Sequence, residues 1–132
     1  MSFARDVAAF AVKSEKAVDQ TVRAITFGLF REVVQRTPVD TGRLKGNWQV
    51  SQGSPARGAL DSSDASGGRT ITAIAGGIGG AGTVTFLANN LAYAERVEYD
   101  SWSKTKAPAG MVRVSFARID SIVAQAARAN RV

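Results

Sequence analysis

Apolar side chains recur at steps of three, four or seven positions over residues 2–36, which is the spacing that lines one face of an α-helix. The positions on this face are Phe3, Val7, Phe10, Ser14, Val18, Ile25, Leu29 and Val33, and all of them except Ser14 are apolar. Pro38 disfavours helical backbone at Thr37, so we expect the helix to end there. The pattern predicts one long N-terminal helix, about three times the usual length, with too little partner surface inside a small domain.

A turn and a strand are predicted after this helix. The sequence TPVDTG at 37–42 favours a turn in which Asp40 accepts a hydrogen bond from a backbone N–H two residues on, and Gly42 takes a positive φ. From Leu44 to Val50 apolar and polar residues alternate, which predicts a strand with one buried face. Trp48 lies on that face, so we expect it in the core.

The middle of the chain is less regular. Residues 51–69 contain four glycines and five serines without periodicity, which predicts a long mobile loop that orders against a partner. Residues 70–76 fit either a short helix or a strand. Residues 83–88 alternate again and predict a second strand, and residues 91–99 predict a short helix.

A second amphipathic helix is predicted near the C-terminus. Pro108 suits the first position of a helix, and apolar residues continue at helical spacing to about residue 129. Together the elements predict a single α+β domain over residues 1–132. In this fold a long N-terminal helix and a C-terminal helix pack on a small antiparallel sheet.

Composition narrows the chemistry available to the chain. The 132 residues include 45% hydrophobic residues, which is typical of a globular domain, and there is no cysteine or histidine. Cysteine nucleophiles, zinc fingers, iron–sulfur sites, disulfide frameworks and histidine bases are therefore excluded. No stretch is long and apolar enough for a membrane span, and the N-terminus lacks the continuous apolar run of a signal peptide, so we expect neither membrane insertion nor export by that route.

Two stretches invite a catalytic or cofactor interpretation. Residues 77–82 match G-x-G-x-x-G, but a dinucleotide site needs this turn between a strand and a helix, and here a predicted strand follows, so a connecting loop is favoured. Glu95, Glu98 and Asp100 form an acidic cluster, and a hydrolase using Glu98 and Asp100 remains one hypothesis. Ion pairing at the surface or between subunits is favoured, and we predict no catalytic residue, metal ligand or cofactor.

The charge is +6, and residues 101–132 carry six basic residues against one acidic residue. A candidate basic patch near Trp102 consists of Lys104, Lys106, Arg113 and Arg118. Such a patch is typical either of a solvated helix face or of a surface that faces DNA or another subunit. A small basic nucleic-acid-binding protein is therefore an alternative function.

Two segments resemble a known family. Residues 37–48, TPVDTGRLKGNW, resemble one signature of the minor tail or neck proteins of long-tailed bacteriophages, and residues 92–113 resemble the second signature in the expected order. The matching positions in the first segment are Pro38, Asp40, Thr41, Gly42, Leu44 and Trp48. Those in the second are Tyr93, Glu98, Tyr99, Pro108, Gly110 and Met111. Asp100 stands where the family usually has glycine.

The resemblance implies a structural virion protein without catalysis, made in the bacterial host cytoplasm and assembled into the particle. It implies a homo-oligomeric ring at the head–tail junction, sixfold or twelvefold, between connector or stopper proteins and a tail terminator or tail tube. The basic charge, taken alone, suits a ring through which packaged DNA passes with nonspecific contact. We expect subunit contacts through the long helix, the loop 51–69 and the segment from Tyr93 to Arg113. In such contacts the acidic cluster would meet Arg113 and Arg118 of the next copy.

Overall fold

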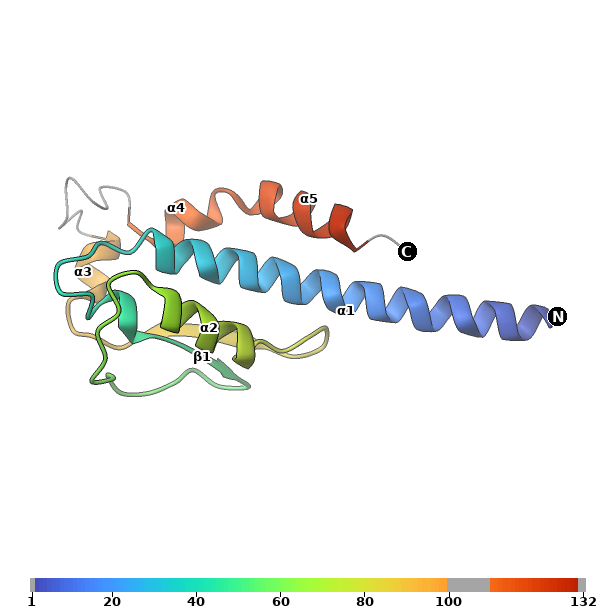
Figure 1. Ribbon diagram of the computed structural model, residues 1–132, viewed down its shortest axis with the longest axis horizontal. Helices are drawn as coiled ribbons and strands as arrows, with labels where there is room; N and C mark the ends of the chain where they lie inside the picture. The colour runs from blue at the N-terminus through green and yellow to red at the C-terminus, as the bar shows by residue number, and fades with distance from the viewer. Residues whose placement is uncertain (1, 100–109, 131–132) are drawn as a thin grey trace.

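The computed structural model describes residues 2–99 and 110–130. Its longest element is α1 (Phe3–Gln35), which runs along most of the length of the molecule in Figure 1. The helix ends as predicted: the N–H of Arg36 still bonds to the carbonyl of Glu32, and Pro38 follows two residues later. The predicted long N-terminal helix is therefore confirmed, with bounds one residue shorter at each end.

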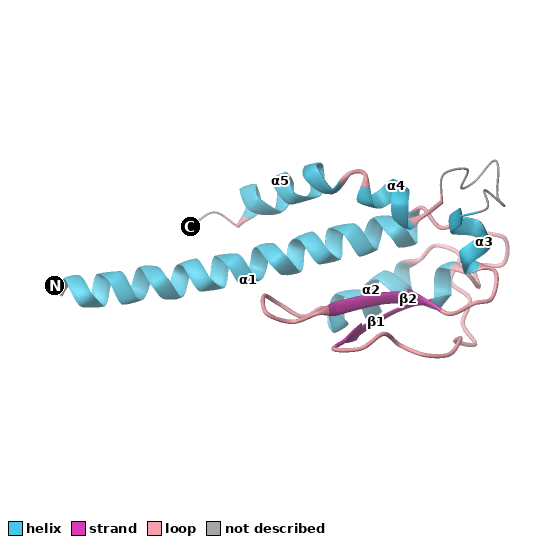
Figure 2. Cartoon of the chain, turned by 180° about the vertical axis from the view of Figure 1, so that it is seen from behind, coloured by secondary structure: helices cyan, strands magenta, loops and turns pink. Residues whose placement is uncertain are grey.

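The other elements gather around the C-terminal half of α1. In chain order they are η1 (Lys45–Asn47), β1 (Trp48–Gln52), α2 (Gly68–Gly77), β2 (Thr85–Asn89), α3 (Ala94–Tyr99), α4 (Val112–Phe116) and α5 (Ile119–Ala129). Figures 1 and 2 show α4 and α5 along one side of α1, with α2 and the sheet on the other side. The N-terminal turns of α1 extend past all of them.

The sheet has two strands, β1 and β2, which pair antiparallel with Trp48 opposite Asn89 and Gln52 opposite Thr85. The predicted α+β fold with a long N-terminal helix and a small antiparallel sheet is confirmed. The ambiguous segment 70–76 is helical and belongs to α2, and the predicted second strand is β2.

The hydrophobic core lies where the end of α1, α2, α3 and the sheet converge. Its buried members are Val33, Val34, Leu44, Trp48, Ile74, Ile78, Leu91, Ala94, Val97 and Met111. The predicted burial of Trp48 is confirmed, since 8% of the residue is exposed. A second contact joins α1 to α5, where Ile122 is buried and a Cβ on Gly28 would lie 3.0 Å from its side chain.

The predicted strand over 44–50 is wrong in its first half. Residues 45–47 form a single 3-10 turn, and Lys45, Gly46 and Asn47 are all buried rather than alternating. Asn47 explains the difference: its amide donates to the carbonyl of Arg43 at 2.8 Å, and its Oδ1 accepts the N–H of Leu60 at 2.6 Å. A short run of alternating residues thus coincides with a tight turn that uses its polar side chain internally.

The predicted C-terminal helix is also corrected. Helical structure begins at Val112, and the element divides into α4 and α5 around Ala117 and Arg118. The N–H of Arg118 bonds to the carbonyl of Ser115, three residues back, which tightens the backbone at the junction. Pro108, the predicted first residue, lies outside the described residues.

The predicted loop 51–69 is shorter than expected, because its first two residues belong to β1 and its last two to α2. The remaining residues fold back onto the turn after α1, where the N–H of Asp64 bonds to the carbonyl of Gly42 at 2.9 Å. The mobility of this loop stays a prediction.

Candidate assembly interface

The TPVDTG segment closes the end of α1 onto the sheet. The Thr37 hydroxyl donates to the carbonyl of Val33 at 2.7 Å and accepts the indole N–H of Trp48 at 2.8 Å, and both bonds are buried. Leu44 is buried, and its carbonyl accepts the side-chain amide of Asn89 at 2.8 Å. Through these contacts residues 37–48, the first segment that resembles neck proteins, connect the end of α1 rigidly to β1 and β2.

The turn itself is built differently from the prediction. Gly42 has φ +85°, and a Cβ there would lie 2.6 Å from the backbone nitrogen of Ala65, so the predicted need for glycine is confirmed. The local side-chain bond, however, comes from Thr41, whose hydroxyl accepts the N–H of Arg43 at 3.3 Å. Asp40 is exposed and its carboxylate bonds to none of the described residues, so its predicted capping role is wrong.

Asp64 is a structural carboxylate that the sequence pattern did not reveal. It is buried, and its oxygens accept the backbone N–H of Gly67 at 3.2 Å and both the N–H and the hydroxyl of Thr70 at 2.8 Å, which satisfies the start of α2. Burial by itself would raise the pKa of Asp64, but these hydrogen bonds hold it below its usual value. The sequence signal that could have revealed this cap is an aspartate, Asp64, shortly before Gly67, Gly68 and Thr70.

Glu98 fastens α3 to the start of α4. Its carboxylate accepts the backbone N–H groups of Met111, Val112 and Arg113 at 2.7, 2.7 and 3.1 Å, and the Nε of Arg113 at 2.8 Å. Burial would raise the pKa of Glu98, but the hydrogen bonds from Val112, Met111 and Arg113 keep it below its usual value. With its oxygens occupied in this way, Glu98 is a helix cap and is not placed to act as a general base.

The neighbouring motif residues complete this joint. Met111 is 1% exposed, and Gly110 has φ +86° with its α-carbon so close to Glu98 that a Cβ would lie 2.6 Å from the Glu98 carbonyl oxygen. The Arg113 guanidinium also donates to the Glu98 carbonyl and lies 5.2 Å from the centre of the exposed Tyr99 ring. Tyr93 is half-buried against the core.

The structure breaks up the predicted basic patch. Arg113 pairs with Glu98 at 2.8 Å and Arg118 pairs with Glu32 at 2.6 Å, all within the same chain. Glu98 thus already has an arginine partner in its own chain, and the expected contact between the acidic cluster and Arg113 and Arg118 of the next copy stays a prediction. Lys104 and Lys106, like Asp100 and Trp102, lie outside the described residues. The described half of the patch is thus neutralised by carboxylates.

The glycine-rich segment 77–82 connects a helix to a strand, α2 to β2, which is the reverse of the order that a dinucleotide turn needs. Two side chains of α1 hold it. Asp19 accepts the N–H of Ala81 at 3.1 Å, and the Arg23 guanidinium donates both to Asp19 and to the carbonyl of Ile78, at 2.9 and 2.8 Å. The hydrogen bond from Arg23 lowers the pKa of Asp19.

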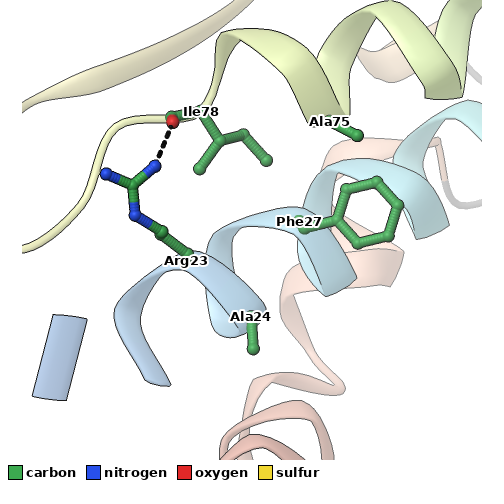
Figure 3. A pocket seen from close by; sticks show the side chains of 5 residues that line it. All are labelled: Arg23, Ala24, Phe27, Ala75 and Ile78. Atoms are coloured by element: carbon green, nitrogen blue, oxygen red, sulfur yellow. Dashed lines mark hydrogen bonds between the residues drawn. The ribbon is translucent and has the colours of Figure 1, made fainter. Parts of the chain in front are cut away.

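An open pocket of about 230 Å³ lies beside this anchor, between α1 and α2. Its lining residues are Arg23, Ala24, Phe27, Ala75 and Ile78, shown in Figure 3. Figure 3 also shows the Arg23 guanidinium engaged with the Ile78 carbonyl. The polar groups drawn there bond to each other, so the free surface of the pocket is mainly hydrocarbon and aromatic.

The N-terminal turns of α1 carry large apolar side chains that are mostly exposed. Phe3 is 83% exposed, Phe10 62% and Val7 51%, and every residue from 3 to 13 is exposed to solvent. Neither α2 nor α5 reaches this part of the helix (Figures 1 and 2). Large aromatic side chains gathered on a bare helix face mark an interaction surface.

No protein-family model, curated protein or solved structure matches this chain. Among residues 2–99 and 110–130, no three histidine, cysteine, aspartate or glutamate side chains converge as a metal site would require. Within the same ranges, no helix combines the length and the apolar character needed to cross a bilayer.

Proposed function

We propose that this chain is a structural virion protein that forms a ring at the head–tail junction of a long-tailed bacteriophage, as a tail-completion or tail-terminator type component. The observation that carries the proposal is the bare apolar end of α1. A helix face with Phe3 and Phe10 largely in water is costly for a free subunit and is explained by coverage in an assembly.

The structural roles of residues 37–48 and 92–113, the two segments that resemble neck proteins, support this proposal. Thr37 and Trp48 lock α1 to the sheet, and Glu98 with Gly110 locks α3 to α4. These residues close turns and cap helices, which gives a rigid subunit. The resemblance of both segments to neck proteins is the reason for proposing a ring at the head–tail junction. The chain's net charge of +6 suits a ring through which DNA passes.

The partners in this proposal are further copies of the chain, in a sixfold or twelvefold ring, with connector or stopper proteins on one side and a tail terminator or tail tube on the other. The alternative, a nucleic-acid-binding monomer, receives less support because Arg113 and Arg118 are already paired with Glu98 and Glu32.

The test is mass spectrometry and electron microscopy of purified particles from a host that expresses the chain. We expect several copies at the head–tail junction, and deletion of the gene should yield separate heads and tails. A single copy, or none, in intact particles overturns the proposal. Steep salt-dependent DNA affinity of the isolated monomer would favour the nucleic-acid alternative instead.

A further inference from the structure

We propose that the ammonium group of Lys45 and the first turn of α2 form a binding site for a small oxyanion of the phosphate class. This site goes beyond the proposed function and stands or falls separately from it. The argument starts from an unusual side chain. Only 8% of Lys45 is exposed, whereas a lysine is almost never buried to this extent unless it is paired.

Lys45 has no anionic partner in the part of the chain that the structure describes. Among residues 2–99 and 110–130, the ion pairs join other residues, and the Lys45 ammonium donates no hydrogen bond. Within the same ranges, only an oxygen of Glu32 is both sealed from solvent and without a hydrogen bond, so the Lys45 ammonium keeps contact with solvent. An unpaired charge at the end of a buried stem is therefore accessible to an external anion.

The Lys45 stem is held beside the start of α2. A Cβ on Gly67 would lie 3.1 Å from Cδ of Lys45 and 3.0 Å from Cγ1 of Val34, so the backbone of Gly67 packs against both side chains. Only two bonds separate Cδ from the ammonium nitrogen, which places the charge next to the first turn of the helix. Gly67 has φ +81°, and any side chain at this position would have to displace the stem.

The first turn of α2 supplies a partial positive charge and a free donor. The N–H groups of Gly67 and Thr70 bond to Asp64. That of Gly68 bonds to a serine hydroxyl at 3.2 Å. The N–H of Arg69 bonds to none of the described residues, because no helical carbonyl lies four positions before it. A helix N-terminus with a free N–H group favours a bound anion.

The charges around this turn leave it positive. Asp64 is the carboxylate at the helix end, but its oxygens already accept hydrogen bonds from the first turn of α2. The exposed guanidinium of Arg69 donates to the carbonyl of Ser63 in the preceding loop. Lys45, Arg69 and the helix dipole together exceed the single charge of Asp64, and a small oxyanion would restore the balance.

A compact oxyanion suits this site better than a nucleic-acid backbone. Lysine binds phosphate as a point charge, and helix N-termini bind it through backbone N–H groups. A small ion can approach closely, because a Cβ on Gly68 would meet only a serine hydroxyl oxygen, at 3.5 Å. So little of Lys45 is exposed that a DNA duplex, with its phosphates on a wide convex surface, reaches the ammonium poorly.

The test is nuclear magnetic resonance of the purified, nitrogen-15-labelled full-length chain, titrated with inorganic phosphate and, separately, with sodium chloride of equal ionic strength. We expect phosphate alone to give saturating shifts of the Gly68 and Arg69 amide resonances, with half-saturation at millimolar concentration. Lys45→Met keeps the apolar stem and removes the charge, so it should weaken this binding about tenfold or more. Lys16→Met is the matched control, because Lys16 is exposed on α1 and the net charge changes equally, and its half-saturation should equal that of wild type.

A short DNA duplex is the second arm of the experiment and should leave the Gly68 and Arg69 amides unshifted. If the duplex shifts them at a lower concentration of phosphate groups than inorganic phosphate does, the site belongs to nucleic acid and the inference is overturned. Absence of the phosphate shifts in the wild-type chain also overturns it, whatever the stability of the variants. So does equal binding by Lys45→Met and Lys16→Met, because Lys45 is then a core-packed stem with a hydrated head.

Discussion

The joint at Glu98 gives a prediction whose size follows from its contacts. Glu98→Ala removes the acceptor for the N–H groups of Met111, Val112 and Arg113. A buried donor left without a partner costs about 1–3 kcal/mol. The N–H of Met111 is buried and bears this cost in full, while those of Val112 and Arg113 lie nearer the surface, where water replaces part of the bond. We therefore expect the free energy of unfolding to fall by about 2–4 kcal/mol.

The measurement is urea unfolding followed by far-ultraviolet circular dichroism, with the stability taken from the midpoint and slope. Glu95→Ala is the matched control on the same helix, because Glu95 is exposed and its change should stay within about 0.5 kcal/mol of wild type. Glu98→Gln keeps one acceptor oxygen and should fall between the two. A loss below about 1 kcal/mol for Glu98→Ala would show that the carboxylate does not hold α3 and α4 together.

Three other outcomes are expected. Trp48→Ala should lower unfolding stability by about 3–5 kcal/mol in the same urea assay, because it empties a buried aromatic site. Because the pKa values of Glu98 and Asp64 are lowered in the fold, their stabilisation is complete above the unfolded value of about 4 and is lost as pH falls through the lowered folded values. Acid titrations of stability should therefore flatten in Glu98→Gln. Gly110→Ala should destabilise, since its Cβ meets Glu98, whereas Gly76→Ala, with open space around it, should stabilise α2 by about 0.5–1 kcal/mol as judged by melting temperature.

Local patterns predicted the elements that depend on local physics. The apolar period identified α1, Pro38 marked its end, and alternation found β2 and the burial of Trp48. These features depend on spacing along the chain and on which backbone angles a residue allows. Neither requires knowledge of what packs against the element.

The buried polar side chains that connect distant parts of the chain could not be predicted in the same way. Asn47 and Glu98 are buried because their partners, such as Leu60 and Met111, come 13 residues later in the chain. A hydrophobicity pattern assigns such residues to the surface, because it cannot foresee a distant donor. The division of the C-terminal helix has a similar origin, since Arg118 at the break pairs with Glu32 of α1.

The bare N-terminal turns of α1 also have a thermodynamic consequence for association. Ser2 stands at the N-cap position, but its hydroxyl makes no capping bond. About a dozen helical residues without tertiary contacts are marginal in water, because nucleation is costly and propagation adds little per residue. These turns therefore exchange between helix and coil in a free subunit. A neighbouring subunit that covers these turns must first offset the conformational entropy that is lost when they become ordered. Association is therefore weaker than the contact area suggests. A scaffold that raises the local concentration of subunits promotes it.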